Sequence, residues 1–188
     1  MKIRVGINGF GRIGRSVFRI LAAQDDVDIV AVNDIFGLQT LAYLLKYDSI
    51  MGPFGPQVTH DKEALFIDGK KVAMSACKDP AALPWAELGC DVVVESTGIF
   101  TSRSALQKHL EAGAKRVLLT VPPKDEIDNM VVLGVNDQSL VPAHKLVSNA
   151  SCTTNCLAPI AKILAMAARQ LVVHEALDTS LCAGTKLW

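Results

Sequence analysis

Two cysteines stand four residues apart among small hydroxyl and amide side chains in the stretch SNASCTTNC, residues 148–156. A metal site, a disulfide and a nucleophile at the start of a helix could each use such a pattern. None of the other cysteines or the four histidines falls at zinc spacing, so no metal site is expected. A Cys152–Cys156 disulfide would cross one helical turn, which is strained geometry. The nucleophile interpretation remains.

Cys152 follows an expected strand, 145–149, and precedes an expected helix, 153–168. Free N–H groups and the helix dipole at such a position favour a thiolate, so we predict that Cys152 is the nucleophile. Cys156 lies one turn inside the helix and is expected to be a small buried hydrophobe. The same expectation holds for the remaining cysteines, Cys77, Cys90 and Cys182.

A second chemical signal is GFGRIG, which places glycines in the pattern G-x-G-x-x-G after an expected strand, 3–8, and at the start of an expected helix, 12–23. In this context Gly9 permits the turn, Gly11 lets the backbone approach a pyrophosphate, and Gly14 lets helix and strand pack closely. The pattern therefore predicts a dinucleotide site.

Three further residues complete that site. Arg12 and Ile13 begin the helix, whose N–H groups and dipole would face the phosphates. Asp34 closes the next expected strand, and its carboxylate can accept hydrogen bonds from both hydroxyls of the adenosine ribose. Its charge would repel a 2′-phosphate, which favours NAD over NADP. The alternative is a structural glycine turn with a surface aspartate.

The elements that must position these residues alternate along the chain. Strands are expected at 3–8, 28–34, 91–97, 115–120, 130–134 and 145–149, and helices at 12–23, 38–47, 102–113 and 153–168. The D-G pair within 65–74 predicts a hairpin, while Ser102 and Gly113 are expected to begin and end a helix. Repeated strand–helix–strand units indicate an α/β fold, a Rossmann-like doubly wound, mostly parallel sheet.

Composition narrows the class of protein. The 188 residues suffice for one good-sized domain, half of them are hydrophobic, and the formal net charge is zero without a basic block. Nucleic acid is therefore not an expected partner. The absence of a membrane-length apolar run and of a signal peptide predicts a protein without a membrane partner. Five scattered cysteines, an odd count, fit reduced thiols in the cytoplasm.

Several motifs together resemble the N-terminal half of glyceraldehyde-3-phosphate dehydrogenase: INGFGRIGR, VND, KYDS, LPWAELGCDVVVESTG, HLEAGAKRVLLT, LGVN and SNASCTTNCLAP. The resemblance implies an NAD-dependent oxidoreductase of glycolysis that attacks a small phosphorylated aldehyde with Cys152 and uses inorganic phosphate to release the acyl group. It also implies a homotetramer in the family, doubtful for this chain. An erythrose-4-phosphate dehydrogenase-type enzyme and a catalytically silent NAD-binding module are the alternatives.

The resemblance also assigns residues. It implies substrate contacts for Ser151 and Thr153, which flank the nucleophile. It implies cofactor contacts for Arg12, Ile13, Asp34 and Thr120, and for Lys78, which stands where the family commonly has arginine. Asn8 and Thr97 are expected to face the cofactor crevice. Side chains that only hydrogen-bond to the backbone of an ordinary turn would explain these two residues nearly as well.

The family pattern ends at about residue 164. We expect residues 1–150 to form the NAD-binding domain, 151–164 to form the nucleophile-bearing helix, and 165–188 to be a tail that does not match the family, as in a truncated reading frame. The substrate domain and the segment with the catalytic base are then missing. His174, the only histidine after Cys152, is not expected to replace that base.

Overall fold

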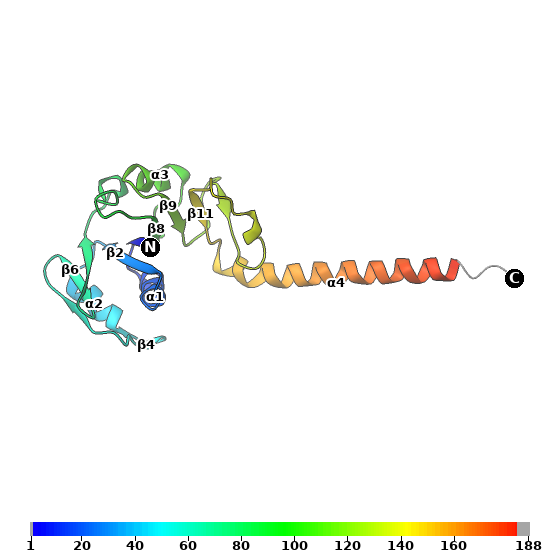
Figure 1. The fold of residues 1–188 in the computed structure, drawn as a ribbon, viewed down its shortest axis with the longest axis horizontal. Coiled ribbons are helices and arrows are strands. Elements are labelled where there is room, and N and C mark those ends of the chain that lie inside the picture. Colours follow the sequence, from blue (N-terminus) through cyan, green and yellow to red (C-terminus); the bar gives the residue numbers. More distant parts are fainter. Residues whose placement is uncertain (1, 184–188) are drawn as a thin grey trace.

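The computed structural model describes the backbone of residues 2–183 and the side chains of residues 2–169 (Figure 1). Its α-helices are α1 (Arg12–Leu21), α2 (Leu38–Lys46), α3 (Arg103–Glu111) and α4 (Cys152–Ala183). Its strands are β1 (Ile3–Asn8), β2 (Val27–Asn33), β3 (Tyr47–Asp48), β4 (Gly52–Pro53), β5 (Val58–His60), β6 (Ala64–Ile67), β7 (Lys70–Ser75), β8 (Val92–Glu95), β9 (Arg116–Leu119), β10 (Asn129–Met130) and β11 (Leu146–Ser148).

Within the described residues, nine strands form one sheet in the order β10-β11-β9-β8-β1-β2-β7-β6-β5, and β3 pairs with β4 in a separate ribbon. The neighbours from β10 to β7 run parallel, whereas β6 is antiparallel to both β7 and β5. From β1 the chain passes through α1 to β2 on one side, and later enters β8 on the other side. Ligands of open parallel sheets bind beyond the carboxyl ends of the strands at such a reversal.

Helices cover both faces of the sheet. On one face, Ile7 of β1 packs with Phe18 of α1 and Leu45 of α2. On the other face, Leu106 of α3 packs with Leu119 of β9. This arrangement of two cores around a mostly parallel sheet confirms the predicted Rossmann-like α/β fold class.

Two local predictions are confirmed by backbone geometry. The D-G turn joins β6 to β7, and Asp68 and Gly69 have φ values of 48° and 81°, as a two-residue hairpin turn requires. At α3, the Ser102 hydroxyl accepts a hydrogen bond from the N–H of Ala105, and Gly113 follows the helix with a φ of 105°.

Other predictions differ from the structure. The strand expected at 130–134 is limited to β10. The N–H of Val132 donates to the Asn136 side chain and the N–H of Gly134 donates to the Asp137 side chain. Neither N–H group is therefore free to hydrogen-bond to a neighbouring strand. Strands β3, β4 and β5 were not predicted. Helix α4 starts near the expected position but continues beyond the expected end at residue 168 and runs away from the sheet (Figure 1).

Candidate functional site

The loop between β1 and α1 requires glycine at two positions. Gly9 has a φ of 90°, and a Cβ there would lie 2.6 Å from the backbone nitrogen of Thr97. A Cβ on Gly14 would overlap the carbonyl oxygen of Gly9, so α1 can start this close to β1 only with glycine. Gly11 differs, because an added Cβ would have no neighbour within 4 Å. The backbone at Gly11 is therefore open to a ligand.

The start of α1 is suited to an anion. The helix begins at Arg12, and Gly11 at its N-cap offers no side-chain hydrogen bond to the first N–H groups. Those groups have no partners within the helix, and the helix dipole adds partial positive charge. The exposed side chains of Arg12 and Ile13 lie at this end, so the two predicted phosphate-binding positions coincide with the uncapped helix start.

A cleft of about 440 Å³ lies at the carboxyl edge of the sheet, lined by residues from the ends of β1, β2 and β8 and from the segment after β7. It brings together six of the predicted cofactor residues, Asn8, Gly9, Gly11, Asp34, Lys78 and Thr97. Apolar side chains complete the lining: Ile35, Phe36, Ile99 and Phe100. Apolar walls with a few polar groups are typical of sites for flat ring systems.

Asp34 is attached to the glycine turn. Its Oδ2 accepts a hydrogen bond from the backbone N–H of Phe10 at 2.6 Å, and its Oδ1 accepts one from the N–H of Phe36 at 2.9 Å. A carboxylate offers about four acceptor sites, so each oxygen retains capacity for a ligand hydroxyl. The predicted role of Asp34 is compatible with this geometry.

The other predicted cofactor residues do not line the cleft: Arg12, Ile13, Gly14 and Thr120. The first three form the start of α1. Thr120 follows β9, where its backbone N–H and its hydroxyl each donate to the Glu95 carbonyl oxygen at 3.1 Å. Thr120 thus joins the ends of β9 and β8, and its contact with a cofactor stays a prediction.

A buried polar network beside the cleft was not predicted. Glu95 and His109 are completely buried, and Asn8 and Asn33 nearly so. The one signal in the sequence is the acidic residue that ends the apolar run VVVE, because a buried carboxylate needs hydrogen-bond partners. The sequence does not reveal that the partner of Glu95 is His109 of α3.

Cys152 is the first residue of α4 and its side chain is exposed, which confirms the predicted position at a helix start. Ser151 caps this helix, since its Oγ accepts a hydrogen bond from the N–H of Thr154 at 2.9 Å. Ala150 is buried and has a φ of 58°, a left-handed conformation that is costly for alanine. Strained turns of this kind cluster at functional sites. The Cys152 Sγ lies 4.0 Å from the hydroxyl of Thr153.

The expectation for the other cysteines needs correction. Cys156 is exposed, not buried, because α4 leaves the sheet instead of packing against it (Figure 1). Cys90 is buried as predicted, and burial raises the pKa of its thiol to about 11. Cys77 is only half-buried and lines the cleft. The side chains of His174 and Cys182 lie outside the described residues.

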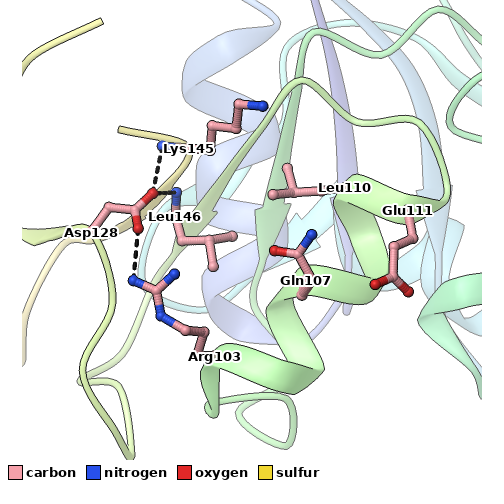
Figure 2. Close-up of a pocket in the computed structure, with 7 residues that line it drawn as sticks. All are labelled: Arg103, Gln107, Leu110, Glu111, Asp128, Lys145 and Leu146. Atoms are coloured by element: carbon pink, nitrogen blue, oxygen red, sulfur yellow. Dashed lines mark hydrogen bonds and ion pairs between the residues drawn. The ribbon is translucent and has the colours of Figure 1, made fainter. Parts of the chain in front are cut away.

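Figure 2 shows a second depression, of about 430 Å³, between α3 and β11. Asp128 accepts hydrogen bonds there from the N–H groups of Lys145 and Leu146 and pairs with Arg103 at 2.7 Å. Partial burial opposes ionisation of this carboxyl group, but the hydrogen bonds outweigh it and lower the pKa of Asp128 to about 2. None of the predicted site residues lines this depression, so we assign the site to the cleft.

Neither a membrane-spanning helix nor a metal site is found in the part of the chain that the structure describes. No helix there combines the length and apolar character that crossing a bilayer requires. No group of three or more histidine, cysteine or acidic side chains is arranged there to hold a metal ion.

The chain is similar to known proteins. A family model described as "Glyceraldehyde 3-phosphate dehydrogenase, NAD binding domain" matches residues 3–103. Glyceraldehyde-3-phosphate dehydrogenase of Streptomyces coelicolor is 53% identical over 166 residues, which cover 87% of this chain and 49% of the relative. The enzyme of that name from Geobacillus stearothermophilus is 53% identical over 165 residues, with the same coverage.

The corresponding protein of Pseudomonas aeruginosa is 47% identical over 188 residues, covering 98% of this chain and 55% of the relative. This alignment extends beyond residue 164. The expected boundary there, between the nucleophile-bearing helix and a tail that does not match the family, stays a prediction. The chain spans about half the length of the curated relatives it matches.

Proposed function

Because the chain belongs to the glyceraldehyde-3-phosphate dehydrogenase family, we propose that its cleft binds NAD and that Cys152 is the nucleophile of a phosphorylating aldehyde oxidation. One observation carries this proposal. The open glycine turn, the uncapped start of α1 and Asp34 lie together at the carboxyl edge of the sheet, where Cys152 follows β11.

The cleft residues fit a dinucleotide. The open backbone at Gly11 and the start of α1 would hold the pyrophosphate, and Asp34 would accept hydrogen bonds from the adenosine ribose. Lys78 and the apolar side chains of the lining would flank the adenine. When bound, NAD supplies an acceptor for a hydride from the substrate.

Cys152 would carry the covalent chemistry. Its thiolate, favoured by the start of α4, adds to the aldehyde carbon of the substrate and forms a C–S bond. The former carbonyl oxygen takes up a proton to give a hemithioacetal. Loss of hydride from its carbon to the bound acceptor, and of the hydroxyl proton to a base, would leave a thioester. Inorganic phosphate then attacks the thioester carbon, the C–S bond breaks, and an acyl phosphate and the thiolate result. Ser151 and Thr153 would contact the substrate beside the sulfur.

A catalytically silent NAD-binding module is the second candidate. It is favoured by the surroundings of Cys152, because within residues 2–169 the hydroxyl of Thr153 is the only side-chain hydrogen-bond partner of its sulfur. A general base is needed to accept the hydroxyl proton. Turnover measurements separate the two candidates, and comparison of glyceraldehyde 3-phosphate with erythrose 4-phosphate as substrates separates the two enzyme types.

Calorimetric titration with NAD tests the binding site. Gly11→Ala places a methyl group in the open position of the turn, and we expect it to weaken NAD binding about tenfold or more through the lost close approach. Gly55→Ala is the matched control, because its added Cβ also meets no atom within 4 Å but Gly55 does not line the cleft. Equal affinities of Gly11→Ala and the unmodified chain would contradict the proposed site.

A further inference from the structure

Glu95 occupies an unusual position at the end of β8. Its side chain has 0% exposure, yet both carboxylate oxygens have partners. Oε2 lies 2.5 Å from Nδ2 of Asn8 and 3.0 Å from Nε2 of His109. Oε1 accepts hydrogen bonds from the backbone N–H of Thr97 at 2.8 Å and from its hydroxyl at 2.5 Å. Four potential donors therefore converge on one buried carboxylate.

The direction of the hydrogen bond from Asn8 is fixed by the backbone of Cys77. The Asn33 Oδ1 accepts from the Cys77 N–H, and the Asn33 Nδ2 donates to the Cys77 carbonyl, so the Asn33 amide can have only one orientation. Its Nδ2 also donates to Oδ1 of Asn8 at 2.7 Å. The Nδ2 of Asn8 must therefore face Glu95 as a donor.

The direction of the hydrogen bond from His109 is fixed by Trp85. An indole nitrogen is a donor only, and Nε1 of Trp85 lies 3.0 Å from Nδ1 of His109. Nδ1 is thus the acceptor of a neutral imidazole ring, and the ring proton is on Nε2, where it points at Glu95. Both rings are completely buried.

These directions indicate an ionised Glu95. Asn8, His109 and the Thr97 backbone all donate to it, and the Thr97 hydroxyl, which accepts from the N–H of Ile99, has its own proton free to donate as the fourth. A carboxylate that only accepts is the ionised form. Within residues 2–169 no lysine or arginine pairs with it, so hydrogen bonds alone compensate the buried charge.

The network ends at the cleft. Asn8, Asn33, Cys77 and Thr97 all line it, and they belong to β1, β2, the segment after β7 and the segment after β8. A fully satisfied buried network is rigid, and breaking one member leaves others without partners. One carboxylate, which does not itself line the cleft, thus links these four segments beyond the pairing of their strands.

We propose that Glu95 and His109 are positioning residues that pre-organise the cleft for its dinucleotide, with Glu95 acting as a buried anionic acceptor. The inference rests on the proposed function, that the cleft binds NAD. Pre-organisation raises affinity because the ligand then does not have to order the binding loops itself. Asn8 and Thr97, expected from the sequence to face the cofactor, hold the shape of the cleft through this network.

The decisive variant is Glu95→Gln, which keeps the size but turns one of the two acceptor oxygens into a donor. We expect its dissociation constant for NAD to rise about tenfold, the effect of one buried hydrogen bond left unmade. Asp128→Asn is the matched control, because Asp128 is also a carboxylate that accepts two backbone N–H groups but lines the depression of Figure 2 and not the cleft. We expect its affinity for NAD to equal that of the unmodified chain.

If Glu95→Gln does not fold, Thr97→Val replaces it, since it removes the hydroxyl that donates to Glu95 and accepts from the N–H of Ile99. Normal NAD affinity in the folded variant would overturn the inference, and so would an equal loss in Asp128→Asn. If the unmodified chain did not bind NAD, the proposed function would be wrong, and this inference would be wrong with it.

A spectroscopic measurement on the unmodified chain tests the directions of the hydrogen bonds independently of stability. The ¹⁵N chemical shifts of His109 should show a neutral ring protonated on Nε2. A ring protonated on Nδ1, or a doubly protonated ring, would contradict the assignment of Glu95 as the acceptor.

Discussion

The carboxylate of Asp34 accepts a hydrogen bond from the backbone N–H of Phe10 at 2.6 Å, which joins the residue after β2 to the glycine turn after β1. Phe10 is completely buried against Phe18 of α1, so this turn cannot shift without disturbing the core. The negative charge is thus held at a defined point of the cleft, and a ligand must accommodate it.

Preference between the two dinucleotides follows from that charge. We expect the chain to bind NAD at least about tenfold more tightly than NADP, because two like charges about 4 Å apart repel by roughly 1–4 kcal/mol. Asp34→Asn keeps an acceptor for Phe10 but removes the charge, and it should narrow the difference. Titration of both cofactors with both proteins is the measurement, and equal affinities in the unmodified chain would remove Asp34 from this role.

Thiol reactivity should single out Cys152. Its exposed side chain and its place at the start of α4 favour the thiolate, so limiting iodoacetamide near neutral pH should label it first. Cys90 should react last, because burial raises its pKa to about 11. Peptide mapping by mass spectrometry gives the order.

The exposed Cys156 makes this a stringent comparison, since the two cysteines share α4 and differ by one helical turn. A Cys152→Ser variant serves as the control for site assignment. Faster labelling of Cys156 or Cys77 than of Cys152 would show that position at the helix start does not control reactivity.

Turnover by the 188-residue chain should be slow. Cys152 needs a general base, and the loss of such assistance typically costs about 10²–10⁴ in rate. NADH formation from glyceraldehyde 3-phosphate and phosphate, with a Cys152→Ala control, should therefore fall at least about a hundredfold below that of a full-length relative. Vigorous turnover that depends on Cys152 would show that another group of the chain acts as the base.

Stability should depend on pH through Asp128. Its pKa is lowered to about 2 in the folded chain, so it stabilises the fold above its ordinary pKa, and this contribution is lost as the pH falls towards 2. Asp128→Asn should therefore lower the free energy of unfolding by about 2 kcal/mol at pH 7. Urea unfolding of both proteins between pH 7 and pH 3 is the measurement, and a constant difference over that range would contradict the assignment.

Much of the fold was predictable because its signals are local. The bounds of β1 match the expectation, and α1 starts at the expected residue, since an apolar run followed by a glycine turn and an amphipathic stretch determines both. The D-G hairpin and the Ser102 cap depend only on neighbouring residues. The prediction of a strand at 130–134 was wrong, because side chains of the following turn accept hydrogen bonds from the backbone N–H groups of this segment.

By itself, the sequence determined the α/β class, the dinucleotide pattern of Gly9, Gly11 and Gly14, and the place of Cys152 at a helix start. These features follow from periodicity and from the conformational freedom of glycine, which neighbouring residues reveal.

Only the tertiary structure decided that Glu95 is a buried acceptor, that His109 and Asn8 are its donors, and that Cys156 is exposed. Asn8 is 87 residues from Glu95 along the chain, and the two meet because β1 and β8 pair in parallel. No local pattern encodes which residues a sheet will bring together, or which helix face it leaves to solvent, because both depend on how distant elements pack.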